Sequence, residues 1–181
     1  MAVATMEAIY SLAAGVLSRY GMPWHEARHL AESCAAATFS LNQATQDILP
    51  MGNLVGLMQS LRDVEIQIAV VTSDDRQITQ NMLDHLGIRD LVSILICGDD
   101  QLPSKPAPDV IWRIANQLDI PPSRMMVVGD SLSDMRFAAN AGAAYRIGVK
   151  SEAETSTRLA EYADAVIASL DEIKVIPQDN D

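Results

Sequence analysis

The sequence lacks three features that would each point to a particular class of protein. It has only two cysteines, Cys34 and Cys97, which are far apart and match no metal-binding spacing; this indicates two thiols in a reducing compartment. No apolar run approaches the length that spans a bilayer, and no basic segment precedes an apolar one at the N-terminus, so we expect a cytoplasmic protein. Positive charge is also scarce. The net charge of −11 argues against nucleic acid or a membrane as a partner.

Apolar residues make up 49% of the 181 residues, which is enough to form the core of one domain of ordinary size with a small appendage. Residues 1–48 read as a small helical block. An apolar stripe at helical spacing predicts a helix over residues 6–20, ended by Gly21. Pro23 opens a second helix, and a shorter element covers residues 41–48. No strand pattern occurs in this block.

From residue 49 to residue 181 the pattern changes to strands that alternate with helices. Strands are predicted at residues 66–71, 92–96, 125–128, 144–149 and 165–167. Helices are predicted at residues 53–61, 75–86, 108–118, 132–141 and 152–161. This alternation predicts an α/β fold, a Rossmann-like three-layer core with a mostly parallel sheet between two layers of helices.

Ligands of open parallel sheets bind beyond the carboxyl ends of the strands, so the loops that follow the predicted strands are the candidate site. Thr72 and Ser73 follow the first strand and could hold phosphate oxygens with the next helix N-terminus. Lys105 could bridge a phosphate and a carboxylate. Asp130 and Asp134 are hard oxygen ligands suited to Mg²⁺, one in the loop and one a turn into the following helix.

Each of these residues also has a plain structural interpretation. Thr72 and Ser73 are ordinary helix caps, and Lys105 before a proline is commonly a solvated loop residue. Asp130 and Asp134 could be a cap and a first-turn carboxylate that complements the helix dipole. Two further carboxylates, Asp99 and Asp100, are most simply turn formers. The ordered set, rather than any single residue, favours a site.

Three short motifs occur in order: "IAVVTS" with Thr72, "SKPAPD" with Lys105, and "VVGDSLSDM" with Asp130 and Asp134, followed by "AANAGA". With these motifs the sequence resembles the haloacid dehalogenase superfamily of hydrolases, in its phosphoglycolate phosphatase and β-phosphoglucomutase branch. The resemblance implies catalytic roles for Thr72 and Lys105, phosphate binding by Thr72, Ser73 and Lys105, and Mg²⁺ binding by Asp130 and Asp134. It also implies that the helical block is a short cap and that the substrate is a small phosphorylated metabolite.

The family's first motif, an apolar strand followed by Asp-x-Asp, has no match in the expected place. The single Asp-x-Asp of the chain is Asp179-Asn180-Asp181, which we expect to be a tail. We therefore expect a truncated chain that begins just after the catalytic loop. Its sheet should either pair directly across the place of the absent central strand or leave two open edges there.

Three functions remain open from these observations. The chain could be a hydrolase of the phosphatase type with weak or no turnover, because the family's nucleophile is the Asp of the unmatched motif. It could instead be a non-catalytic protein that binds phosphate and Mg²⁺. It could also be an interaction protein that forms a homodimer through the gap in the sheet.

The substrate cannot be read from the sequence. The cap offers five polar or aromatic candidates for recognition, and a solvated cap surface is the alternative interpretation of the same residues: Arg19, Trp24, His25, Arg28 and His29.

Overall fold

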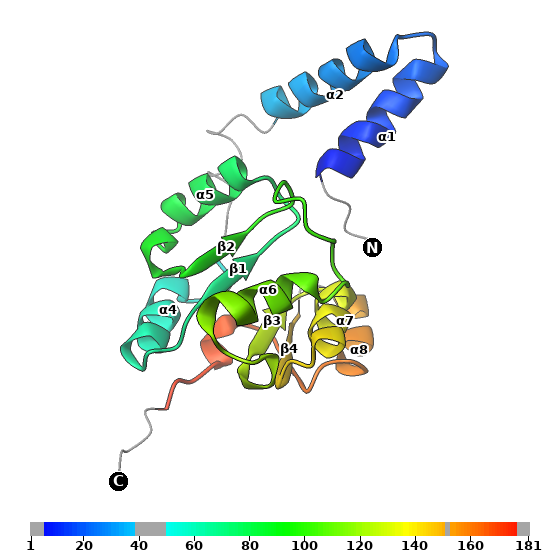
Figure 1. Cartoon of the computed structure of the whole chain (residues 1–181). Helices are drawn as coiled ribbons and strands as arrows, with labels where there is room; N and C mark the ends of the chain where they lie inside the picture. The colour runs from blue at the N-terminus through cyan, green and yellow to red at the C-terminus, as the bar shows by residue number, and fades with distance from the viewer. Residues whose placement is uncertain (1–5, 39–49, 151–152, 177–181) are drawn as a thin grey trace.

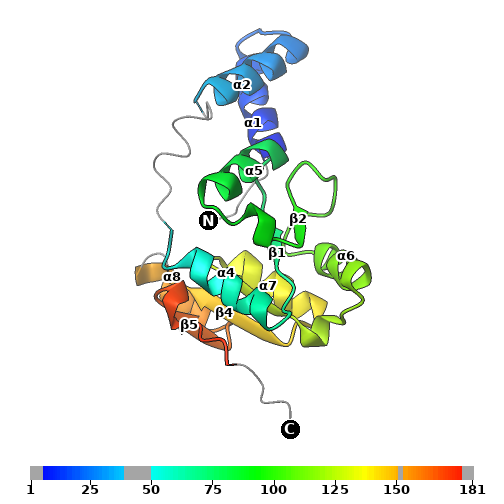
Figure 2. The ribbon, with the colours of Figure 1, turned by 90° about the vertical axis from the view of Figure 1, so that its left-hand side faces the viewer.

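The N-terminal block is a hairpin of two helices. The computed structural model describes residues 6–38, 50–150 and 153–176. Helix α1 covers Met6–Arg19 and helix α2 covers Trp24–Thr38, and they pack against each other at one end of the molecule, next to α5 (Figures 1 and 2). Both predicted helices are confirmed, whereas the element predicted at residues 41–48 lies outside the described residues.

The remainder is an α/β unit, which confirms the predicted fold class. Its helices are α4 (Leu54–Asp63), α5 (Arg76–His85), α6 (Asp109–Leu118), α7 (Leu132–Ala141) and α8 (Ala153–Ala160). Its strands are β1 (Ala69–Val71), β2 (Ile94–Ile96), β3 (Met126–Gly129), β4 (Tyr145–Val149) and β5 (Ala165–Ile167). The described residues also form three 3₁₀ turns that the sequence pattern did not predict: Arg89–Leu91 before β2, Pro122–Arg124 before β3 and Leu170–Glu172 after β5.

The strands form two separate parallel sheets rather than one. Strand β1 pairs with β2, and β3 pairs with β4, which pairs with β5. Within the described part of the chain, β1 and β3 do not pair with each other. Of the two outcomes considered for the centre of the sheet, the structure therefore has the open edges and not the direct pairing.

One apolar core nevertheless joins the two sheets. Its buried members come from β2, α6 and α7: Ile94, Ile96, Val110, Ile111, Ile114, Phe137 and Ala141. Val71 of β1 and Val127 of β3 pack against this cluster from the two sheets. Helix α6 lies in the segment that connects β2 to β3, and its buried face belongs to the core that both sheets share. It therefore holds one sheet in position relative to the other (Figure 1).

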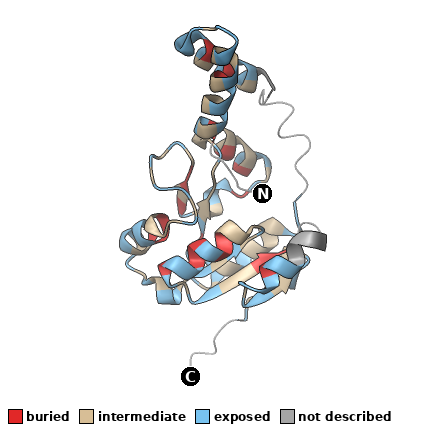
Figure 3. Ribbon diagram, turned by 90° about the vertical axis from the view of Figure 1, so that its right-hand side faces the viewer, coloured by how far each residue is buried: buried red, intermediate tan, exposed pale blue. Residues whose placement is uncertain are grey.

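The opposite side of the strands is less well covered. Helix α4 is amphipathic but has no buried side chain, and Met126, Val128 and Tyr145 on the strands are exposed (Figure 3). Among the described residues, no helix is long and apolar enough to cross a membrane. The two cysteines form no disulfide, as expected from their separation in the sequence.

Candidate functional site

The carboxyl ends of β1 and β3 lie on either side of a hollow of about 230 Å³. Because about 10–15 Å³ of such space is enough for one water, the hollow can take a small ionic group with its hydration. Its walls come from three loops that are far apart in the sequence, and its lining contains all five predicted site residues: Val71, Thr72, Ser73, Asp74, Lys105, Asp130, Ser131, Ser133 and Asp134. The structure therefore brings the predicted residues together, although it does not test their roles.

Lys105 connects the two sheets at this point. Its Nζ donates to the Val71 carbonyl at the end of β1, at 3.1 Å, and to Asp134 Oδ1 in α7, at 2.7 Å. The amino group also lies 5.8 Å from the centre of the Phe137 ring. The side chain is only 20% exposed, so this is not the solvated loop lysine of the plain interpretation. The contacts fix a positive charge at the edge of the hollow.

Asp134 has partners for both of its carboxylate oxygens. Oδ1 accepts from Lys105, and Oδ2 accepts from the Ser131 N–H at 3.1 Å and the Ser131 hydroxyl at 2.6 Å. The Ser131 hydroxyl in turn accepts from the Asp134 N–H, which makes a capping box at the start of α7. The first-turn interpretation of Asp134 is therefore confirmed. Its role as a metal ligand stays a prediction, because both oxygens already have other partners.

Asp130 stands at the end of β3 with its side chain exposed and facing the same hollow. The preceding Gly129 is needed for this arrangement, because a Cβ there would lie 2.6 Å from the Asp134 Cβ. The strand can thus turn tightly enough to present Asp130 beside the buried Asp134.

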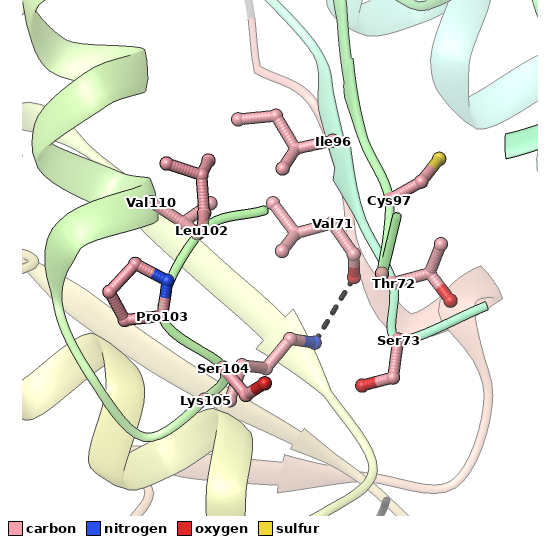
Figure 4. A pocket seen from close by; sticks show the side chains of 11 residues that line it. Val71, Thr72, Ser73, Ile96, Cys97, Leu102, Pro103, Ser104, Lys105 and Val110 are labelled. Carbon is pink, nitrogen blue, oxygen red and sulfur yellow. Dashed lines mark hydrogen bonds between the residues drawn. The ribbon is translucent and has the colours of Figure 1, made fainter. Parts of the chain in front are cut away.

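The side chains of Thr72 and Ser73, which follow β1, point in different directions. The Thr72 N–H still donates to the Ile96 carbonyl of β2 at 3.0 Å, and its hydroxyl donates to Asp74 Oδ2 at 2.8 Å. Figure 4 draws a neighbouring pocket that shares Val71, Thr72, Ser73 and Lys105 with the hollow; the Ser73 hydroxyl there is turned toward Lys105 and the Thr72 hydroxyl is turned away. Gly98 lies directly against Ser73, whose carbonyl oxygen would be 2.2 Å from a Cβ at this position. The loop after β1 is therefore held in place by the loop after β2.

Asp99 and Asp100, the acidic pair after β2, form contacts with the start of α5 in addition to their place in a turn. Asp99 accepts from the Arg76 N–H at the start of α5, and Asp100 forms an ion pair with the Arg76 guanidinium. Burial tends to raise the pKa of Asp100, but hydrogen bonds from Arg76 and from the Cys97 N–H outweigh it and lower the pKa. Burial raises the pKa of the neighbouring Cys97 thiol. These contacts anchor the helix behind the hollow.

One contact ties the helical hairpin to this region. The Tyr10 hydroxyl donates to Asp75 Oδ2 at 3.4 Å. Burial, followed by the nearby charge of Asp99, raises the pKa of Asp75. Arg28, a candidate for substrate recognition, is engaged within the hairpin by Glu7, Glu32 and Ser11, and its side chain is 24% exposed, so its role in recognition stays a prediction.

The residues around the hollow fit a magnesium ion of the kind that keeps most of its waters. Magnesium sites in proteins commonly use one or two carboxylates and complete their coordination with water and phosphate oxygens. Asp130 offers one such carboxylate. Within residues 6–38, 50–150 and 153–176 no three acidic, histidine or cysteine side chains form a cage, so these residues do not supply an all-protein site.

Two partners in the site were not assigned from the sequence: Ser131, which holds Asp134, and Phe137, which lies beside Lys105. The first had a readable signal, since a serine followed three residues later by an acidic residue at the start of a helix predicts a capping box. The second had none, because nothing in the local pattern relates a helix residue to a lysine 32 positions earlier.

Comparison with known proteins places the chain among hydrolases. The sequence profile of the haloacid dehalogenase-like hydrolases matches residues 6–147. The chain is 30% identical to a phosphoglycolate phosphatase from Nitrosococcus oceani over 118 residues, which are 65% of this chain and 52% of that protein. It is 29% identical over 102 residues to an N-acetylmuramic acid 6-phosphate phosphatase from Pseudomonas aeruginosa, covering 55% of this chain and 45% of that one. The chain thus spans about half the length of the curated relatives it matches.

The solved structures show the same fold at lower identity. A β-phosphoglucomutase from Clostridium difficile superposes with a TM-score of 0.70 at 19% identity, covering 95% of this chain and 74% of that one.

Proposed function

Because the chain belongs to the haloacid dehalogenase-like hydrolase family, we propose that its hollow binds Mg²⁺ and the phosphate group of a small metabolite. The observation that carries this proposal is the fixed position of the Lys105 amino group between Val71 and Asp134. A lysine held in this way is a point charge that attracts a phosphate oxygen. Because the Lys105 side chain is already ordered in the folded protein, binding a phosphate costs little additional side-chain entropy at this residue.

Other side chains supply complementary contacts. The Ser73 hydroxyl and the backbone N–H groups of the loop after β1 donate to phosphate oxygens, and Thr72 joins them by exchanging its bond to Asp74. Asp130 holds the metal, and Asp134 keeps Lys105 in place. When bound, the metal would neutralise negative charge on the phosphate and polarise its bonds.

Turnover is a separate part of the proposal. The family relationship supports a hydrolase of the phosphatase type, acting on phosphomonoesters in the cytoplasm. In the part of the chain that the structure describes, no Asp-x-Asp follows a strand, and the single Asp-x-Asp of the sequence is at residues 179–181, outside that part. We therefore expect this chain to bind phosphate with weak or no turnover. The alternative is a non-catalytic protein that binds phosphate and Mg²⁺, or an interaction protein that forms a homodimer through the gap in the sheet.

Calorimetry with inorganic phosphate, with and without Mg²⁺, tests the binding part. We expect phosphate to bind in both conditions and more tightly with Mg²⁺. The Asp130→Asn variant should lose the Mg²⁺ effect and keep the metal-free binding, whereas Asp90→Asn, an exposed carboxylate outside the hollow, should change neither. Absence of phosphate binding at millimolar concentrations in the unaltered chain would refute the proposal.

An assay with p-nitrophenyl phosphate and Mg²⁺ tests the catalytic part. Turnover by the unaltered chain above that of Asp130→Asn would show an active phosphatase. A large difference between the two would refute the expectation of weak or absent turnover, and a small difference would agree with it. Turnover equal to that of Asp130→Asn, combined with measurable phosphate binding, would establish the binding-protein alternative.

A further inference from the structure

Helix α1 is apolar on two opposite faces, and only one of them packs against another described element. This face lies against α2, which is the main packing partner of α1 among the described residues, and there Ala14 is fully buried. The other face carries Ile9, Leu12, Ala13 and Val16, whose spacing forms a row along one side of the helix. We call these four residues the α1 stripe.

The α1 stripe is highly exposed for its apolar character. The exposed fractions are 45% for Ile9, 70% for Leu12 and 57% for Val16. Single apolar side chains on a surface are common, but a continuous row of them along one helix indicates an interaction surface. Helix α1 has two charged residues, Glu7 and Arg19, and a helix that is apolar nearly all round is normally buried on both sides. Its composition is therefore that of a central helix, whereas in the single chain it lies on the outside.

The distribution of charge favours a second copy of the chain as the partner of the α1 stripe. The hairpin, residues 6–38, contains two arginines and three glutamates, whereas the whole chain contains 13 basic and 24 acidic residues. Nearly all of the net charge of −11 therefore lies outside the hairpin. A basic partner would be attracted to the acidic α/β unit, and an anionic membrane would be repelled by it. A second copy, which is equally acidic, is repelled least where the surface is nearly neutral, and the hairpin is such a region.

The α1 stripe is also complementary to itself. Two copies of α1 can run antiparallel about a two-fold axis that passes between residues 12 and 13. Ile9 of one copy then lies level with Val16 of the other, and Leu12 and Ala13 of both copies lie together at the centre. Every member of the stripe thus meets another member, as an interface with two-fold symmetry requires. The small side chain of Ala13 allows the two helices to approach closely.

We propose that the chain forms a homodimer through the α1 stripe. The two hairpins pack as four helices, with both copies of α1 in the centre and both copies of α2 on the outside. Each α1 is then covered on both of its apolar faces. The charge of Arg19 lies at the end of the helix, so the two copies of this residue are at opposite ends of the interface. This inference does not depend on the proposed phosphate site, because no residue of the stripe lines the hollow.

Sedimentation velocity of the whole chain tests the proposal. We expect the sedimentation coefficient to rise to that of a dimer as the protein concentration increases from about 1 to 100 µM. Leu12→Glu places a charge at the centre of the interface, beside the same charge of the other copy, and should weaken the dimer at least about tenfold. The matched control is Leu30→Glu, the same change at an exposed leucine of α2 outside the stripe, which should leave the dimer unchanged.

A cysteine at the centre of the stripe locates the interface. In a Cys34→Ser background, which removes the exposed native thiol, Ala13→Cys should form a disulfide-linked dimer on mild oxidation, because the two-fold axis brings the two copies of residue 13 together. Ser33→Cys, at an exposed position of α2, should stay unlinked under the same conditions. Neither substitution adds a charge, so this comparison decides the question if Leu12→Glu does not fold.

A chain that stays monomeric up to about 500 µM would overturn the proposal. Equal weakening by Leu12→Glu and Leu30→Glu, or equal cross-linking of Ala13→Cys and Ser33→Cys, would overturn it as well. A dimer that forms through the gap in the sheet would survive Leu12→Glu unchanged, which distinguishes the two interfaces. If the chain is monomeric and Ala13→Cys resists a thiol reagent, another part of the same chain covers the stripe.

Discussion

Replacing Lys105 by methionine should destabilise the protein far more than an ordinary surface lysine would. Methionine keeps most of the apolar stem beside Phe137 but removes the donor to Val71 and the positive charge beside Asp134. A hydrogen bond to a charged group contributes about 1.5–3 kcal/mol, and a carbonyl left without a donor costs about 1 kcal/mol more. Because Lys105 is 20% exposed and solvent screens part of this, we expect a loss of about 2–4 kcal/mol.

Urea unfolding followed by circular dichroism measures this loss. The matched control is Arg89→Met, which breaks an ion pair with Asp84 whose side chains are 44% and 53% exposed. Exposed pairs of this kind contribute under about 1 kcal/mol, so the control should change the free energy of unfolding only slightly. The denaturant dependence should be the same in both variants, since neither alters the surface exposed on unfolding.

A double-mutant cycle separates the contact from the rest of the site. Asp134→Leu alone leaves the Lys105 charge without its carboxylate, and adding Lys105→Met should recover at least about 1 kcal/mol of that loss. Equal losses in Lys105→Met and Arg89→Met, or strictly additive losses in the double variant, would show that Lys105 does not link the two sheets.

Two further predictions concern the loops behind the hollow. Gly98→Ala should cost several kcal/mol or prevent folding, because its Cβ would lie 2.2 Å from the Ser73 carbonyl oxygen, whereas Gly15→Ala, with open space around it in a helix, should raise the melting temperature. Asp100→Asn should remove a pH-dependent part of the stability. The pKa of Asp100 is lowered in the folded protein, so its ion pair with Arg76 stabilises above the unfolded carboxyl pKa of about 4 and is lost as the pH falls through the lower folded value. The variant's free energy of unfolding should thus fall less between pH 5 and pH 2, and an unchanged slope would contradict this reasoning.

The elements of the fold were predictable because their signals are local. The helix over Leu132–Ala141 has a serine cap at its start and Gly142, in the left-handed conformation, at its end, and both bounds were predicted from the sequence. Strand ends were less predictable. The run of residues 66–71 contains four β-branched apolar residues, but only Ala69–Val71 form a strand paired with β2, because pairing depends on a second segment.

The site residues were predictable as a set but not in their individual contacts. The spacing of Asp130 and Asp134 fits a pair of metal ligands as well as it fits a loop residue and a helix cap. What distinguishes the two cases for Asp134 is the amino group of Lys105, which comes from a loop 29 residues earlier. The hydroxyl of Thr72 likewise donates to Asp74, a contact that the spacing of the motif did not predict.

The sequence by itself determined the alternation of strands and helices and the three loops in which carboxylates, hydroxyls and one lysine gather, because helix periodicity, caps and strand runs depend on neighbouring residues. Only the tertiary structure decided that Lys105 bridges two sheets, that Asp134 is buried against it, and that β1 and β3 do not pair with each other in the described part of the chain. Each of these depends on segments brought together by the packing of α6 and α7, and no local pattern records which distant edge or side chain a residue will meet.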